Sequence, residues 1–316
     1  MVRGSEFVGV DVSKDALDVA VFEGPSWQMP NDEEGLPALV EQLGSRPVRL
    51  VVLEASGGLE VPIAAALASA KVAVAVVNPR QVRDFARATG QLAKTDRLDA
   101  QVIARFAEAV KPDPRPLPDA QARELDALVT RRKQVAEMIV METNRLKQAL
   151  PTLRPVIQAH IEWLRGQRGQ LDAQLDQVVK ESPLWLEREE LYCSMIGVGQ
   201  VTAHILIADL PELGTVSNKR ISALGGLAPL NRDSGTIRGR RIIWGGRKRV
   251  RTALYMAAVA AARYNPIIRA YYESLLARGK ERKVALVACM HKMLITLNAM
   301  ARSGRKWEAV RVVRAA

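Results

Sequence analysis

The stretch EFVGVDV, residues 6–12, decides the fold of the first part of this 316-residue chain. Val8, Val10 and Val12 alternate with Gly9, Asp11 and Ser13. A period of two residues predicts a strand with one apolar face. Residues 17–22 read as a second strand, and the short link between them predicts a hairpin. The chain therefore opens on a strand that has an aspartate on the face opposite the valines.

Beyond the hairpin, helical spacing alternates with short apolar runs. Helices are predicted over 32–43, 61–69 and 96–109, and buried strands over 48–54 (VRLVVLE) and 72–77. The order strand–strand–helix–strand–helix–strand–helix indicates an α/β domain, a mixed sheet with helices on its faces.

A proline-rich segment, KPDPRPLPD at 111–119, marks the end of this domain. Residues 119–150 and 156–179 then carry apolar residues at three- and four-residue spacing, which predicts two long antiparallel helices broken near Pro151–Pro155. They form a coiled-coil-like linker that is an oligomerisation element, an RNA-holding arm or a plain spacer. We divide the chain into residues 1–115, 116–185 and 186–316.

The last part is predicted to be all-α. SMIGVGQVTAHILIADL, from Ser194, places a Gly-x-Gly turn between apolar segments, as in a helix-hairpin-helix element whose glycines let the backbone approach a phosphate. Helices are predicted over 250–264, 267–278 and 283–303.

The positive charge is confined to this last part. Residues 218–316 hold 22 Lys and Arg against 4 Asp and Glu, a net charge of +18, whereas the remaining residues have a net charge of −6. Such a field attracts polyanions, so we expect binding to nucleic acid. Two cysteines in apolar surroundings match no disulfide framework or zinc spacing, and no signal peptide or run of about 18 apolar residues is seen. We therefore expect a cytoplasmic protein that does not enter a membrane.

Four acids form the first candidate site. Asp11 lies within a strand, Glu54 ends an apolar strand, and Asp96 and Asp99 are three residues apart where a helix begins. A carboxylate at a sheet position loses hydration energy unless a cation or hydrogen-bond donors compensate. Acids from these elements converge in a sheet of the ribonuclease-H type and can hold two divalent ions about 4 Å apart. Glu60 competes with Glu54, but we expect it to be exposed.

Ser234 is the second candidate, in the polar stretch GGLAPLNRDSGTIRGRRIIWGGRKRVR. A serine in a turn is usually structural. Here eight basic residues surround it and can neutralise a phosphate attacked by a serine nucleophile. We predict that they bind nucleic acid: Arg232, Arg238, Arg240, Arg241, Arg247, Lys248, Arg249 and Arg251.

The motifs VGVDVSKDALDVAVF, LEASGG, NPRQVRDFA and KTDRLDAQVIARF, followed by GVGQVTA, GLAPLNRDSG, RVRTALY and GKERKVALVA, resemble transposases of insertion-sequence family one-ten, relatives of the Piv-type DNA invertases. The resemblance covers nearly the whole chain. Thr252 in RVRTALY departs from it, since the family more often has arginine there.

The resemblance implies a RuvC-like domain with a DEDD quartet at Asp11, Glu54, Asp96 and Asp99, and a catalytic serine at Ser234. It implies two Mg²⁺ ions, replaceable by Mn²⁺, a covalent serine–DNA link, donor and target DNA, and a bridge RNA that pairs with both. It also implies a homo-oligomer, a dimer that becomes a tetramer in the synaptic complex. Because roughly 135 residues separate Asp99 from Ser234, the two halves meet by folding back or across subunits, and we favour the latter.

Two alternatives remain beside the serine recombinase. One is a metal-dependent nuclease, junction resolvase or invertase that uses water as nucleophile, with Ser234 structural. Another is a non-catalytic protein that binds RNA or DNA. A tyrosine recombinase is excluded, because the three histidines of the chain form no Arg…His-x-x-Arg…Tyr arrangement.

Overall fold

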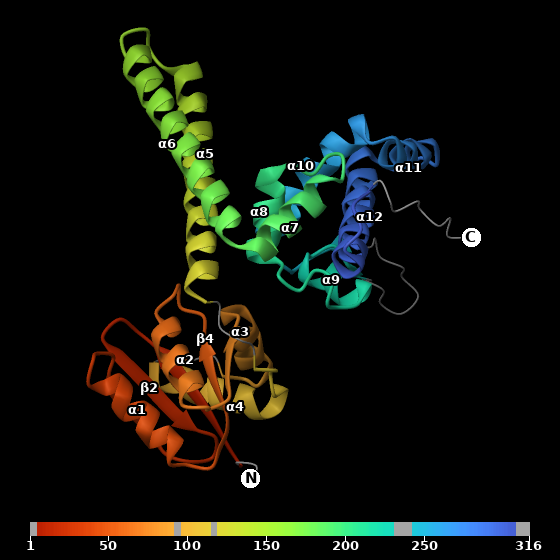
Figure 1. Cartoon of the computed structure of the whole chain (residues 1–316). Coiled ribbons are helices and arrows are strands. Elements are labelled where there is room, and N and C mark those ends of the chain that lie inside the picture. The colour runs from red at the N-terminus through yellow and green to blue at the C-terminus, as the bar shows by residue number, and fades with distance from the viewer. Residues whose placement is uncertain (1–4, 92–95, 115–118, 231–241, 308–316) are drawn as a thin grey trace. The chain divides into compact units, whose positions relative to one another are not determined.

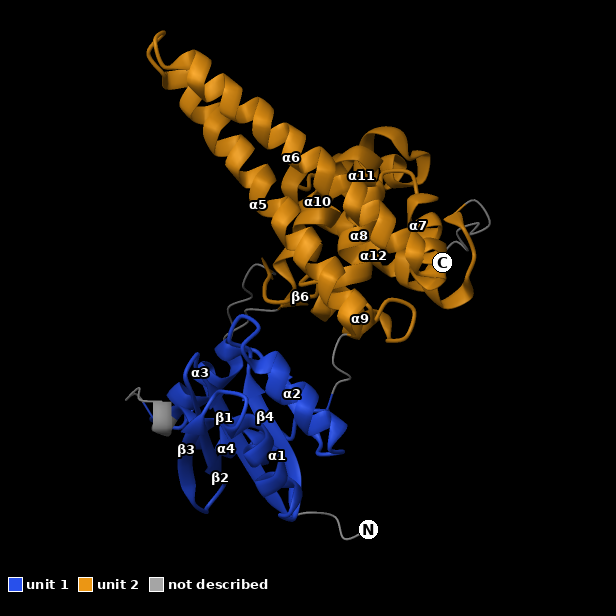
Figure 2. Ribbon diagram, turned by 60° about the vertical axis from the view of Figure 1, so that its left-hand side comes forward, with its two compact units in different colours: residues 1–118 blue, residues 119–316 orange. Residues whose placement is uncertain are grey.

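The computed structural model describes residues 5–91, 96–114, 119–230 and 242–307 (Figure 1). The chain forms two compact units, Met1–Pro118 and Asp119–Ala316 (Figure 2). The two long helices predicted as a separate linker belong to the second unit. Each unit has its own hydrophobic core, so each is described by itself.

The first unit is built on a five-stranded mixed sheet in the order β3-β2-β1-β4-β5. β1 pairs antiparallel with β2 and parallel with β4. The strands are β1 (Glu6–Val12), β2 (Ala16–Val21), β3 (Ser26–Pro30), β4 (Val48–Glu54) and β5 (Val74–Val77). The α/β prediction is confirmed, and β1 and β4 have the predicted bounds. β3 was not predicted, because SWQMP is a short, partly exposed edge strand in which only Trp27 and Met29 face the core.

Helices cover both faces of this sheet. On the valine face, α1 (Gly35–Gly44) and α2 (Glu60–Ser69) enclose an aliphatic core. On the other face lie α3 (Pro79–Ala88) and α4 (Asp96–Val110). α3 was not predicted, because half of its residues are charged or polar and only Val82 is fully buried. Its start is set by Asn78, whose side chain accepts a hydrogen bond from the Arg80 amide.

The second unit begins with the arm, an antiparallel pair formed by α5 (Ala120–Gln148) and α6 (Arg154–Glu181) (Figure 1). Val135 and Ile139 of α5 pack against Leu164 of α6. The Arg132 guanidinium forms an ion pair with Asp172 across the two helices. The predicted helical pair is confirmed.

The base of the arm is part of a larger helical core (Figure 2). Leu125 and Val129 of α5, with Leu175 and Val179 of α6, pack into the same cluster as the later helices. This shared core explains why the arm and the later helices form one unit. The later helices are α7 (Pro183–Cys193), α8 (Gln200–Asp209), α9 (Asn218–Leu224), α10 (Lys248–Tyr264), α11 (Pro266–Ala277) and α12 (Arg282–Ser303).

The predicted helix-hairpin-helix element corresponds to α7, a turn and α8. Gly197 in this turn has φ +106°, and a Cβ there would lie 2.8 Å from the Ala257 carbonyl oxygen of α10. Gly197 is therefore required for close packing on α10, whereas a Cβ at Gly199 would meet nothing within 4 Å, so the approach of a phosphate to this turn stays a prediction.

Within the described residues, α12 has the length and composition of a membrane span, which the sequence analysis did not anticipate. Its apolar residues Cys289, Met293 and Leu297 are fully buried in the helical core. The hydrophobicity of α12 thus serves the interior of the second unit.

Candidate active site

Gly9 of β1 lets α4 lie directly on the sheet. A Cβ at this position would lie only 2.3 Å from the Ala104 amide nitrogen, so no other residue fits without moving the helix. Phe7, on the same face two residues earlier, has the Lys111 Nζ 5.8 Å from its ring centre. Since Lys111 directly follows α4, the helix runs antiparallel to β1, and its first turn lies toward the C-terminal end of that strand.

The strands place acids on this same face of the sheet. Asp11 of β1 is paired in register with Asp18 of β2, so both side chains leave the sheet on one side. Val10 is paired with Leu53, and one residue further along the parallel strands Asp11 comes beside Glu54. Three neighbouring strands thus carry a row of carboxylates across the end of the sheet where α4 begins.

α4 supplies the remaining predicted acids. Asp96 is its first residue, and Asp99 follows three residues later, just before the turn that contacts Gly9. Asp11, Glu54 and Asp99 are each half-buried, and each has an interaction partner. The fold therefore gathers the strand acids and the first turn of α4 at one end of one face.

Asp18 is a fifth acid of this row that the sequence analysis did not select. It is 7% exposed, and the Gln28 Nε2 of β3 donates hydrogen bonds of 3.2 and 3.1 Å to its two carboxylate oxygens. The signal was present: Leu17, Val19 and Val21 define the buried valine face, so period two places Asp18 on the face of Asp11.

Glu60, expected to be exposed, is instead buried. Its Oε2 accepts hydrogen bonds from the amides of Ser56, at 3.0 Å, and Gly58, at 2.9 Å. A carboxylate that accepts amide hydrogen bonds at the start of a helix needs no metal. Glu60 is therefore a structural cap of the loop before α2, and it does not compete with Glu54.

The base of the serine loop is held by a short hairpin. β6 (Pro229–Leu230) pairs with β7 (Ile242–Ile243), and a Cβ on Gly246 would lie 2.2 Å from the Gly226 amide nitrogen. These close backbone contacts bring the two ends of the segment together. Ser234 and four of the predicted nucleic-acid-binding residues lie between the strands, outside the described residues: Arg232, Arg238, Arg240 and Arg241.

Two other predicted binding residues lie in ion pairs within the second unit. Arg247 forms a bidentate pair with Glu212, with distances of 2.5 and 2.6 Å. Arg249 bonds Asp209 at 2.5 Å through Nε, and its other nitrogens reach Asp126 and Thr130 of the arm. Burial lowers the pKa of Arg249, but hydrogen bonds to Asp209 and Asp126 outweigh this effect and raise the pKa overall. Arg249 therefore joins α10 to the arm.

The other two described basic residues, Lys248 and Arg251, differ in how far they are exposed to solvent. Lys248, at the start of α10, is exposed. Arg251 is half-buried, and its Nη1 donates a 2.5 Å hydrogen bond to the Gly245 carbonyl oxygen. Among the four described basic residues, Lys248 is thus the one whose charge faces solvent most openly.

Two models of known protein families match this chain, and together they include residues of both units. Residues 8–155 match a family model described as "Transposase", and residues 189–273 match one described as "Transposase IS116/IS110/IS902 family". The chain belongs to this IS110 family of transposases. The resemblance stated from the motifs is confirmed, and the acid row lies within the first matched region.

Similar IS110-family and inverting proteins cover much of the chain. The Pilin gene-inverting protein of Moraxella bovis is 26% identical over 96% of this chain and 97% of its own length. That of Moraxella lacunata is 25% identical over the same shares. An uncharacterised protein of insertion element IS110 from Streptomyces coelicolor is 31% identical over 54% of this chain and 41% of its own. DNA recombination is thus the general activity of the family.

Proposed function

We propose that this IS110-family member cuts and rejoins DNA through a covalent serine–DNA intermediate, formed by Ser234 with the help of Asp11, Glu54, Asp96 and Asp99. The observation that carries the proposal is the row of acids beneath the start of α4. It rests on the strand register and on the close contact between Gly9 and α4.

The donor set fits Mg²⁺. The side chains that share this end of the sheet offer carboxylate oxygens, the hard ligands that Mg²⁺ and Mn²⁺ prefer. Two bound ions would orient the scissile phosphate and stabilise the charge that develops on it. Asp11, Glu54, Asp96 and Asp99 would hold them.

In the proposed step, the Ser234 Oγ attacks phosphorus. A P–O bond to the serine forms, the P–O bond to one deoxyribose oxygen breaks, and the serine proton passes to a carboxylate or to water. The phosphodiester energy is kept in the serine link, so a second DNA end can displace the serine and restore it. Basic residues of the loop would offset the charge on the phosphoryl group.

The family resemblance also suggests a domain type, an RNA partner, an oligomeric state and a cellular location. We propose a RuvC-like first domain, supported by the sheet order β3-β2-β1-β4-β5 and by the α4 contact on β1. We also propose that a bridge RNA pairs with donor and target DNA, that a dimer becomes a tetramer in the synaptic complex, and that the protein acts in the cytoplasm. The predicted division at 116 and 186 remains part of this proposal, with the arm contributing to oligomerisation or RNA binding.

The test is adduct formation with purified protein, the transcribed RNA flanking its gene, labelled DNA and Mg²⁺. We expect a protein–DNA adduct that resists denaturation, is lost in Ser234→Ala and is lost in Asp11→Asn. Ser69→Ala is the matched control, because Ser69 is an exposed serine at the end of α2. Full adduct formation by Ser234→Ala would refute the serine mechanism.

A second candidate is a DNA invertase or nuclease in which water attacks the phosphate. It is favoured by the two inverting proteins, which align with this chain over almost its whole length. Its signature would be Mg²⁺-dependent nicking without a covalent adduct, with Ser234→Ala still active and Asp11→Asn inactive.

A further inference from the structure

We propose that Asp176, Glu189 and His204 bind a divalent transition-metal ion of the zinc class where α6, α7 and α8 meet. Each residue comes from a different helix of the second unit. Their ligand atoms lie within 4.8 Å of one another. This site is separate in the sequence and in chemistry from the acid row of the first unit.

The distances suit a tetrahedral ion. The His204 Nε2 lies 3.1 Å from the Glu189 Oε1 and 3.8 Å from the Asp176 Oδ1. Zinc bonds to nitrogen and carboxylate oxygen of about 2.0–2.2 Å place tetrahedral ligand atoms about 3.3–3.6 Å apart. The two distances from His204 differ from these values by a few tenths of an ångström, and the Asp176 and Glu189 oxygens lie within 4.8 Å of each other. A small movement would therefore let the three atoms share one ion, with a water molecule as the fourth ligand.

The negative charge of the two carboxylates at this site also favours a bound cation. The Glu189 and His204 side chains are 10% and 5% exposed, and Asp176 adds a second carboxylate to the imidazole. In the described part of the chain, no lysine or arginine forms an ion pair with either acid. Removing a carboxylate from water costs several kcal/mol unless a cation compensates. A divalent ion would neutralise both acids and bind the imidazole nitrogen.

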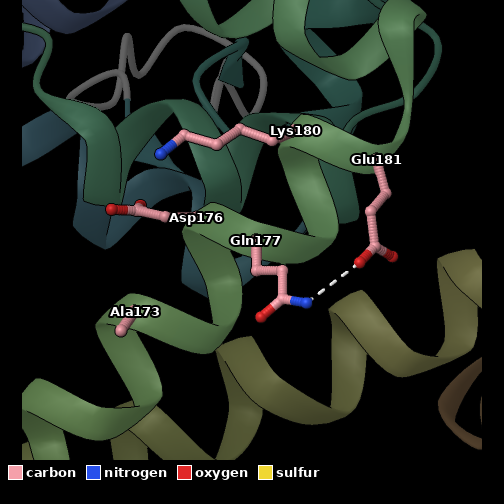
Figure 3. A pocket seen from close by; sticks show the side chains of 5 residues that line it. All are labelled: Ala173, Asp176, Gln177, Lys180 and Glu181. Carbon is pink, nitrogen blue, oxygen red and sulfur yellow. Dashed lines mark hydrogen bonds between the residues drawn. The ribbon is translucent and has the colours of Figure 1, made fainter.

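Asp176 gives an ion a path from solvent. It lines an open pocket on α6 with Ala173, Gln177, Lys180 and Glu181 (Figure 3). The Gln177 Nε2 donates a 3.1 Å hydrogen bond to the Glu181 Oε1, and Asp176 points away from that pair (Figure 3). The Asp176 side chain is 34% exposed, so an ion can reach it from solvent.

The ligand types separate this site from the acid row. Imidazole nitrogen with two carboxylates suits Zn²⁺ or Co²⁺, whereas Mg²⁺ demands an octahedral shell of oxygen atoms. Such an ion would fix the base of the arm, in α6, to the helices α7 and α8 of the core. Its role would be to hold the arm, and the proposed DNA chemistry does not depend on it.

The experiment uses the full chain, stripped with a chelator and reloaded with Zn²⁺ alone or Co²⁺ alone. We expect one equivalent of zinc measured by mass spectrometry, and visible cobalt bands of the strength typical of a tetrahedral site. His204→Gln and Glu189→Gln should each weaken zinc binding by at least about tenfold, judged from the effect of losing metal-site partners. Zinc should also raise the Tm of the wild-type chain.

His160→Gln is the matched control, because the His160 Nδ1 lies 3.7 Å from the Glu142 Oε1 on the arm and the described residues offer no third ligand there. It should bind zinc like the wild type, as should Asp11→Asn. If His204→Gln does not fold, Asp176→Asn at its half-exposed position decides the matter by the same measurements. Unchanged zinc binding and cobalt spectra in a folded His204→Gln or Asp176→Asn chain would overturn the proposal, as would octahedral cobalt spectra alone.

Discussion

At the scale of single residues, Asp18 is a fifth acid beside the four proposed metal ligands. Its carboxylate is buried beside Asp11, and the hydrogen bonds from Gln28 fix its orientation. Burying an acid in that place has a cost that a neighbouring cation would offset. We therefore assign Asp18 to the support of the proposed metal site.

Asp18→Asn should weaken Mn²⁺ binding by about tenfold while the chain stays folded, since supporting groups around metal ligands have effects of this size. Calorimetric titration of the full chain with Mn²⁺ measures it. Asp15→Asn, on the exposed turn of the same hairpin, should bind like the wild type. Equal affinities for the two variants would show that Asp18 is purely structural.

Adjacent basic residues on α10 are predicted to have opposite roles. Arg249→Ala leaves Asp209 buried without its guanidinium partner, so we expect a loss of about 3–5 kcal/mol in the free energy of unfolding. Lys248→Ala should leave stability unchanged and reduce the salt dependence of DNA binding by about one unit of slope. Urea unfolding and binding isotherms at several salt concentrations separate the two effects. A stable Arg249→Ala chain would mean that this ion network does not hold α10 to the arm.

At the scale of elements, the strands of the first unit could largely be predicted. Residues 6–12 alternate with a period of two and residues 48–54 form an apolar run, and the acids stand out against both patterns. β3 and α3 carry weaker signals, because β3 has only Trp27 and Met29 on its inner side and α3 has a short apolar stripe of Val82, Phe85 and Ala86. That Asp11 and Glu54 are neighbours depends on strand order and register, which no local pattern contains.

The contact of α4 with β1 can be tested at Gly9. Gly9→Ala forces α4 off the sheet, so we expect about 1–3 kcal/mol lower stability and a larger loss of Mg²⁺-dependent cleavage, since Asp99 moves with the helix. Gly44→Ala is the control, because its Cβ would meet nothing within 4 Å and alanine favours the helix. Urea unfolding and cleavage assays compare them. Normal cleavage by Gly9→Ala would show that the position of α4 does not matter.

At the scale of the whole molecule, the two units carry complementary parts of the proposed site. The acids belong to Met1–Pro118 and the serine loop to Asp119–Ala316, and the net charge of +18 lies in the last 99 residues. The sequence indicates both parts through composition and motifs. It cannot say which copies of the chain bring them together, because that depends on assembly and not on local patterns.

Mixing Asp11→Ala protein with Ser234→Ala protein should restore part of the DNA cleavage that each lacks alone. In a mixed assembly, an intact acid row of one chain can meet an intact serine loop of another. The readout is adduct yield as the mixing ratio varies, with each variant alone as control. No recovery at any ratio would place the composite site within one chain.

The arm sets a rule for how such proteins can vary in length. α6 has 28 residues, so at about 1.5 Å per residue it is about 42 Å long. Its pairing with α5 depends on facing positions such as Arg132 with Asp172 and Ile139 with Leu164. A single inserted residue would turn these positions by about 100°, whereas seven residues added to both helices nearly restore the facing stripe. We therefore expect related proteins to differ in arm length by equal insertions of about seven residues in both helices.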